Sequence, residues 1–333
     1  MGPIVRVGPR EIAVNTSEGV KTIQKVQRGF AKSEWYDKTG PGLIGMRDRE
    51  KHSHRRRLLA HPLSNTALQD FEPLVQAMVD LAMEKIRHES RRLGHADVYK
   101  WFGLMATDII GDLTFGSSFR MLEQGRGNQY TDDLQSTLHQ VHMRIVLYPL
   151  LDILAYLPLK QAREVGEKFK RIGGYGKESM KRLKHAQATG ALLLLYSSEA
   201  LRLYGTASGS HHCSVPAGGW QIEDYYLPPS TVVTSQAYSL HRRPETFEEP
   251  FSFKPERWLD PTAEMQMAFI PFGERPRICI GINLAYVELR LTTAAFFRAF
   301  KGAVVDPALA DDDMHLENYT LISPKGRKCL VQV

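Results

Sequence analysis

The stretch 271–285 constrains this chain more than any other part of its sequence, because it carries a cysteine to the start of a helix. Leu284, Val287 and Leu291 follow Cys279 at helical spacing, which predicts a largely buried helix. The unpaired N–H groups at a helix N-terminus stabilise a thiolate, the form of cysteine that binds metal. Cys279 is therefore a candidate metal ligand; the alternative is a free cysteine buried in a loop.

The residues around Cys279 favour the metal ligand over the buried free cysteine. Arg277, two residues earlier, lies on the same side of an extended segment and could pair with an anionic ligand. Gly281, two residues later, lets a large flat group approach the backbone. With the cysteine, Phe272, Arg277 and Gly281 resemble the cysteine-ligand loop of the cytochrome P-450 family, whose pattern is Phe-x-x-Gly-x-Arg-x-Cys-x-Gly. Arg275 stands where that pattern has its internal glycine.

The resemblance implies haem b as cofactor, with Cys279 as the axial iron ligand. It also implies that Phe272 packs beside the thiolate and that Arg277 holds a propionate. A basic run over 47–57, followed by leucines, predicts an amphipathic helix. His52 and Arg56 share one face of that helix and match the family's propionate-binding pair; a purely solvated role is the alternative.

A second motif predicts a buried ionic network. Glu199 and Arg202 are three residues apart and match the family's Glu-x-x-Arg pair, while Arg257 lies in a Pro-Glu-Arg-Trp segment. The resemblance implies that the three side chains form one salt-bridge triad. The alternative is a surface ion pair of well under ~1 kcal/mol.

The chain otherwise predicts a mainly α fold with small β-sheets, similar to a cytochrome P-450 but incomplete, in one domain over 1–333. Hydrophobic periodicity and turn residues indicate these elements: a hairpin over 3–14, helices from Ser17, over 71–92, 98–116 and 160–185, and strands over 221–239. The apolar but proline-broken stretch 145–159 is a candidate wall of the substrate-access path.

The sequence changes character abruptly between 186 and 196, where we expect an internal deletion. The family's long central helix carries an Ala/Gly-Gly-x-Asp/Glu-Thr motif whose acid and hydroxyl deliver protons. No such motif occurs in this chain, so no catalytic residue is identifiable. Three acid–hydroxyl pairs occur without the glycines: Glu89-Ser90, Glu178-Ser179 and Glu245-Thr246.

The segment before the Val215–Gly219 turn departs from the family as well. Relatives carry Leu-Pro-Arg there, with the arginine on a propionate, whereas this chain has His211, His212 and Cys213. These three residues leave a zinc site as a further alternative, although it would need a fourth ligand.

Composition adds limits on partners and location. The formal charge of +6 comes without a basic stretch interleaved with aromatic residues, so we expect no nucleic-acid partner. The three cysteines are widely spaced, which is typical of a reducing compartment. The family implies the endoplasmic reticulum membrane, but the chain shows neither an anchor nor a proline-rich hinge, which otherwise favours the cytoplasm.

Together these features predict a haem-thiolate monooxygenase of fungal secondary metabolism. It would insert one atom of dioxygen into a small hydrophobic organic substrate, with electrons from NADPH through a cytochrome P-450 reductase and a peripheral membrane contact. The alternative is a haem-binding or haemless remnant of such an enzyme without catalysis, as the missing central helix suggests.

Overall fold

The computed structural model describes residues 2–24, 29–39, 42–60, 62–133, 192–207, 209–273, 277–319 and 321–333. The chain forms two compact units, each assembled from separate segments. Unit 1 comprises Met1–Leu59, Leu194–Ile282 and Thr320–Ile322; unit 2 comprises Ala60–Leu193, Asn283–Tyr319 and Ser323–Val333. The stretches 145–159 and 160–185 lie outside the described residues, as does most of the junction 186–196. The single domain and its deletion stay predictions.

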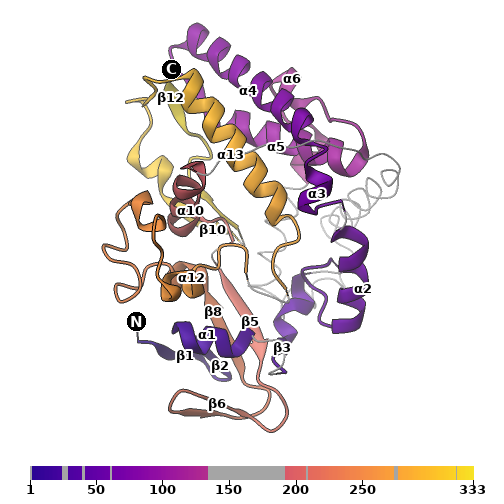
Figure 1. Ribbon diagram of the computed structural model, residues 1–333, viewed down its shortest axis with the longest axis vertical. Coiled ribbons are helices and arrows are strands. Elements are labelled where there is room, and N and C mark those ends of the chain that lie inside the picture. Colours follow the sequence, from indigo (N-terminus) through magenta and orange to yellow (C-terminus); the bar gives the residue numbers. More distant parts are fainter. Residues whose placement is uncertain are drawn as a thin grey trace, which may run out of the picture. The chain divides into compact units, whose positions relative to one another are not determined.

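Unit 1 is built on a five-stranded sheet in the order β1–β2–β8–β5–β3 (Figure 1). β1 (Ile4–Gly8) and β2 (Glu11–Val14) form the predicted antiparallel hairpin. β2 pairs in parallel with β8 (Val232–Gln236), and β8 pairs antiparallel with β5 (Ser210–Ser214). β5 then pairs antiparallel with the edge strand β3 (Ala31–Lys32). A separate hairpin contains β6 (Trp220–Ile222) and β7 (Tyr225–Leu227).

One row of register partners crosses four strands of this sheet. Ile12 pairs with Val233, Val233 with Cys213, and Cys213 with Lys32. Register partners project from the same face of a sheet, so the row runs from the buried Val233 to a lysine on the edge strand.

Short helices complete unit 1: α1 (Ser17–Gln24), η2 (Glu34–Thr39), α2 (Arg49–Ala60), α10 (Leu192–Tyr204), α11 (Ala237–Leu240), η3 (Pro255–Trp258) and α12 (Ala263–Ala268). α2 confirms the helix predicted for the basic run. Its apolar side differs from the expectation, because Leu58 and Leu59 are exposed and His52 is its buried residue. Leu58 lies on the opposite face from Arg56, and Leu59 lies two turns past His52.

Unit 2 is mainly helical, with α3 (Asn65–Leu68), α4 (Glu72–Leu93), α5 (Val98–Phe115), α6 (Met121–Gln124), α13 (Ile282–Ala299) and η4 (Asp311–Met314). β12 (Leu330–Gln332) lies between β4 (Ala96–Asp97) and β9 (Val304–Val305) in a small sheet. β10 (Leu316–Tyr319) and β11 (Leu321–Pro324) form a two-stranded sheet.

Local sequence sets the helix ends in unit 2. α4 has a proline in its first turn and ends at Gly94, whose φ of 82° is the left-handed conformation that favours glycine. The Asp97 side chain caps α5 by accepting from the Lys100 N–H. α4, α5 and α13 share one apolar core, to which α13 contributes the buried Leu284.

The architecture is thus helical with small sheets, as the sequence predicts. Among the residues that the structure describes, none of the helices is both long enough and apolar enough to cross a membrane.

Candidate functional site

The loop before α13 presents Cys279. Its thiol is free and exposed, and its N–H donates to the Phe272 carbonyl at 2.9 Å. Gly273 has a φ of 73°, so the loop turns where a side chain would be strained. A Cβ added at Gly281 would lie 4.0 Å from the Cys279 Sγ, so the glycine keeps space open beside the thiol. Arg275 lies outside the described residues.

Two arginines bind main-chain carbonyls around this loop. Arg56 of α2 donates to the carbonyl of Ile278, the residue before the cysteine, at 2.6 Å. Arg277 donates to the carbonyls of Met46 and Arg47 at 2.8 and 3.1 Å. The structure therefore brings Arg56, Arg277 and Cys279 together, as the sequence hypothesis requires, and both guanidinium groups are tied to neutral acceptors.

His52 faces these arginines from one turn earlier on α2. Burial, followed by the positive charges of Arg277, Lys32 and Arg56, lowers its pKa to about 4. The imidazole is therefore neutral near pH 7, and it can donate one hydrogen bond while accepting another.

Lys32 and Arg49 enlarge this group of positive charges, which the motif comparison did not find. Arg49 donates to the Phe30 carbonyl at 2.9 Å, and Lys32 donates to the Ile44 carbonyl. Burial lowers the pKa of Arg277, and the charges of Arg49 and Arg56 add to that effect. We call Lys32, Arg49, Arg56 and Arg277 the cationic cluster.

No member of the cationic cluster forms an ion pair with a carboxylate among the described residues. Asp48, whose pKa the charge of Arg277 helps to lower, is already engaged in capping α2. It accepts from the N–H groups of Glu50 and Lys51 and pairs with the Lys51 ammonium at 3.8 Å. The cluster therefore carries positive charge that nearby acids leave largely uncompensated.

The three residues 211–213 do not form the zinc site considered from the sequence. They occupy β5, where successive side chains point to opposite faces. His212 stacks on Trp35 with ring centroids 4.3 Å apart, and its Nε2 lies 3.3 Å from the Glu11 carboxylate. Cys213 lies on the other face, where Lys32, Arg277 and Arg49 influence its thiol. Within the described part of the chain, no group of three potential ligands could hold a metal ion.

A second charged group in unit 1 is centred on two fully buried side chains, Glu199 and Arg202. The Glu199 carboxylate accepts two hydrogen bonds from Arg202, at 2.7 and 2.9 Å, and one from Arg257 at 3.1 Å. Arg202 also donates to the carbonyls of His241, Pro250 and Ser252. The three residues thus lie in one network, with Arg202 and Glu199 at 0% exposure.

Two donors to Glu199 come from beyond the predicted triad: the indole N–H of Trp258 and the N–H of Lys254, both at 2.9 Å. Burial alone raises the pKa of Glu199, but hydrogen bonds from Arg202, the Lys254 N–H and Trp258 outweigh it and lower the pKa. The Pro-Glu-Arg-Trp segment contains Trp258, so the sequence could have indicated this donor. The Lys254 N–H has no sequence signal, because nearly every residue has a main-chain N–H.

The acid–hydroxyl pairs have structural roles where they are described. Glu89 accepts from the Trp101 indole at 2.7 Å and from the Asp97 N–H at 3.0 Å, inside unit 2. The Thr246 hydroxyl donates to Glu264 at 3.3 Å. Residues 178–179 lie outside the described residues.

The donor set fits haem b. An exposed thiol lies just before a helix, where its thiolate can bind iron. The same loop contacts positive side chains without acidic partners, which suits two propionates.

The cytochrome P-450 family model matches residues 2–190 and 192–329. Cytochrome P-450 monooxygenase tazI of Aspergillus terreus is 33% identical over 421 aligned positions, which include 100% of this chain and 86% of the relative. Cytochrome P-450 monooxygenase orf2 of Aspergillus niger is 29% identical and is covered to 85%.

Solved structures agree on the fold. The crystal structure of the cytochrome P-450 CYP102L1 superposes with a TM-score of 0.73 at 15% identity, covering 99% of this chain and 90% of that one. CYP175A1 of Thermus thermophilus gives 0.69 at 18%, covering 97% and 89%. Sequence and fold together define a haem-thiolate oxidoreductase. The chain belongs to the cytochrome P-450 family, whose members are monooxygenases that use haem b and take electrons from NADPH through a reductase.

Proposed function

We propose that Cys279 is the axial haem-iron ligand of this chain and that Arg277, His52 and Arg56 hold the propionates. One observation carries the proposal: the Arg56 guanidinium binds the carbonyl of the residue immediately before the exposed Cys279 thiol. Ligand and counter-charge therefore meet at one loop of unit 1.

Each residue then has a defined task. The Cys279 thiolate donates electron density to iron, and Gly281 keeps the backbone beside it clear. Arg277 and Arg56 neutralise carboxylates, while the neutral His52 donates a hydrogen bond to one of them. Phe272 packs beside the thiolate and holds the loop through its carbonyl.

Haem bound in this way supplies the reductive activation of dioxygen, by which the family inserts one oxygen atom into an organic substrate and releases the other as water. For this chain we infer a small hydrophobic substrate from fungal secondary metabolism, since the relatives are fungal monooxygenases. By the same family resemblance we infer peripheral contact with the endoplasmic reticulum membrane.

A second candidate is haem binding without productive turnover. The sequence lacks the Gly-Gly-x-acid-Thr motif, so no residue is assigned to proton delivery. The alignment with tazI spans 421 positions against the 333 residues here, and the family match is interrupted at residue 191. These observations support an internal deletion near 186–196 that includes the central helix.

Two measurements test the proposals in sequence. The reduced, carbon-monoxide-bound absorption spectrum of the purified chain with haem should show thiolate ligation; a spectrum without it contradicts the haem-thiolate assignment. NADPH consumption with a reductase is then compared with oxygenated product from a panel of hydrophobic substrates. Product in near-stoichiometric coupling to NADPH supports the monooxygenase, whereas NADPH loss to peroxide supports the second candidate.

A further inference from the structure

Cys213 lies among positively charged side chains, which would stabilise a carboxylate or a bound anion at its position. Lys32, Arg277 and Arg49 all act on its thiol, yet burial is the larger effect and raises its pKa to about 11. The thiol is therefore neutral near pH 7 and compensates none of these charges. Cys213 also packs partly against the apolar core beside the sheet.

Lys32 is the cross-strand partner of Cys213, so both side chains leave the same face of the sheet. Its ammonium donates to the Ile44 carbonyl and lies 4.0 Å from the centroid of the Tyr36 ring. Burial lowers the pKa of Lys32 to about 8, with Arg277 adding to the effect. A half-buried ammonium held among arginines without an acidic partner is costly unless an anion binds there.

The neighbouring groups offer no such anion within the described residues. His211, on the same face of β5 as Cys213, is neutral because burial lowers its pKa to about 4, and the charge of Lys32 contributes. Burial raises the pKa of the Tyr36 hydroxyl to about 12, so it is neutral as well. Tyr36, His211 and Cys213 are therefore all neutral beside the Lys32 ammonium.

We propose that Lys32, acting from the edge strand β3, binds a haem propionate, whose carboxylate supplies the negative charge that the neutral Cys213 thiol does not. This inference rests on the proposed haem site and assigns to it a residue from outside the family motifs. Lys32 is a cofactor-binding residue on this reading.

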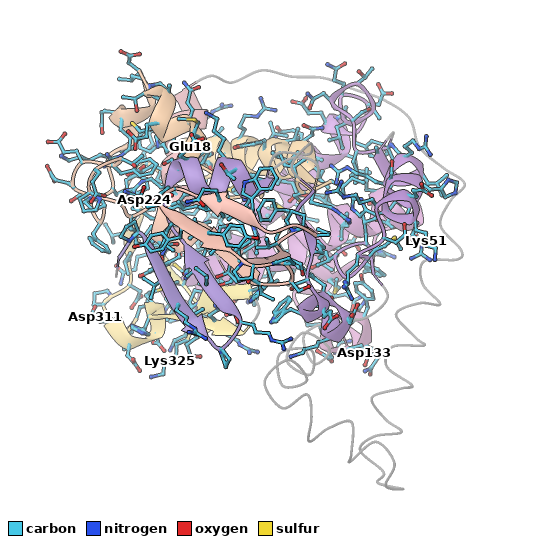
Figure 2. All side chains as sticks on the ribbon, turned by 90° about the horizontal axis from the view of Figure 1, so that it is seen from below. Glu18, Lys51, Asp133, Asp224, Asp311 and Lys325 are labelled. Atoms are coloured by element: carbon cyan, nitrogen blue, oxygen red, sulfur yellow. The ribbon has the colours of Figure 1, made fainter. Side chains whose placement is uncertain are left out.

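Haem titration of the apo chain tests the inference directly. Loss of one charge-assisted hydrogen bond weakens affinity by roughly ten- to a hundredfold, so Lys32→Met should bind haem that much more weakly and Lys32→Arg should bind nearly as well as the parent. Lys51→Met is the control, because Lys51 projects from α2 with 78% side-chain exposure (Figure 2). Haem dimethyl ester, whose propionates are uncharged, should bind parent and Lys32→Met equally.

Equal haem affinity of the parent and Lys32→Met overturns the inference. An equal loss of affinity for haem and its dimethyl ester overturns it too, since that pattern reports damage to the fold rather than a lost charge contact.

A second arm works without haem and separates this inference from the proposed function. Pyrophosphate should raise the melting temperature of the apo parent and of Lys51→Met more than that of Lys32→Met. At low ionic strength without pyrophosphate, Lys32→Met should melt above the parent because one like charge is removed. If the parent fails to bind haem, the proposed function fails, while the pyrophosphate difference still supports anion binding by Lys32. Identical pyrophosphate shifts in all three proteins overturn it.

Discussion

Two groups of charges in unit 1 are built on opposite principles. In the Glu199 network, each arginine meets the carboxylate and main-chain carbonyls, and the pair Glu199–Arg202 is sealed from water. In the cationic cluster, Arg56, Arg277 and Lys32 meet carbonyls alone. The first group pairs two arginines with one carboxylate, and the second has no carboxylate partner among the described residues.

This difference indicates which group holds the fold and which receives a ligand. A buried ion pair loses much when one member is removed, because the remaining charge stays desolvated. A set with surplus charge of one sign gains from an added anion and gives up little when its own charges are reduced.

Glu199→Ala should produce the largest loss. It leaves the buried Arg202 without its counter-charge and removes the acid partner of Arg257, and breaking such a buried pair costs about 3–5 kcal/mol. Denaturant unfolding monitored by circular dichroism measures the difference. Glu249→Ala is the control, because its pair with Lys254 is exposed. Equal stability of Glu199→Ala and the parent would show that the network does not hold the fold.

Arg257→Met should cost less, about 1.5–3 kcal/mol, because one charge-assisted hydrogen bond to Glu199 is lost while Arg202 continues to satisfy the carboxylate. The same unfolding assay applies. A loss equal to that of Glu199→Ala would mean that Arg257, rather than Arg202, is the main partner of the acid.

The network also predicts a pH dependence through His241. Its Nδ1 lies 3.1 Å from the Arg202 carbonyl and its Nε2 accepts from the Ile270 N–H at 2.9 Å, so the ring must be neutral. Burial lowers its pKa from 6.5 to about 3, and the charges of Arg202 and Arg242 add to the effect.

His241 therefore binds a proton in the unfolded chain at pH values where it stays neutral in the folded chain. The free energy of unfolding consequently falls as the pH drops below about 6.5. From pH 7 to pH 5 the His241 contribution amounts to about 2 kcal/mol. Unfolding free energies measured across this range should fall less steeply in His241→Gln than in the parent. The exposed His315→Gln serves as control; an unchanged slope in His241→Gln would contradict the burial argument.

The sequence anticipates those parts of the site that depend on fixed spacing. Cys279 and its glycine are local to one loop, and Glu199 and Arg202 are one helical turn apart, so a linear pattern contains them. The role of Lys32 could not be predicted from a linear pattern, because its position beside Cys213 depends on the register of a two-residue strand. The same is true of the carbonyls that hold Arg202 and Arg277, since main-chain acceptors are present at every position.

Helices and strands also differ in how well the sequence predicts them. The β1–β2 hairpin and the helices α4 and α5 have strong local signals, namely alternation, an apolar stripe and glycine ends. In α2 the leucines suggested an apolar side, yet Leu58 and Leu59 are exposed. The composition of α2 is amphipathic, but the face that a helix buries depends on its tertiary neighbours, which a local sequence pattern does not identify.

The smallest predicted effect on stability is at Cys279 itself. Its thiol is exposed in the apo chain, and substitutions at such positions change stability by about 0.5 kcal/mol or less. Cys279→Ala should therefore unfold like the parent while its reduced, carbon-monoxide-bound spectrum loses every sign of thiolate ligation. Cys329→Ala should keep the spectrum, because that thiol packs against the core of unit 2. If Cys279→Ala keeps the thiolate spectrum, another cysteine is the ligand. If Cys279→Ala instead unfolds as readily as Glu199→Ala, the cysteine loop itself stabilises the fold, and the contrast between the two charged groups does not hold.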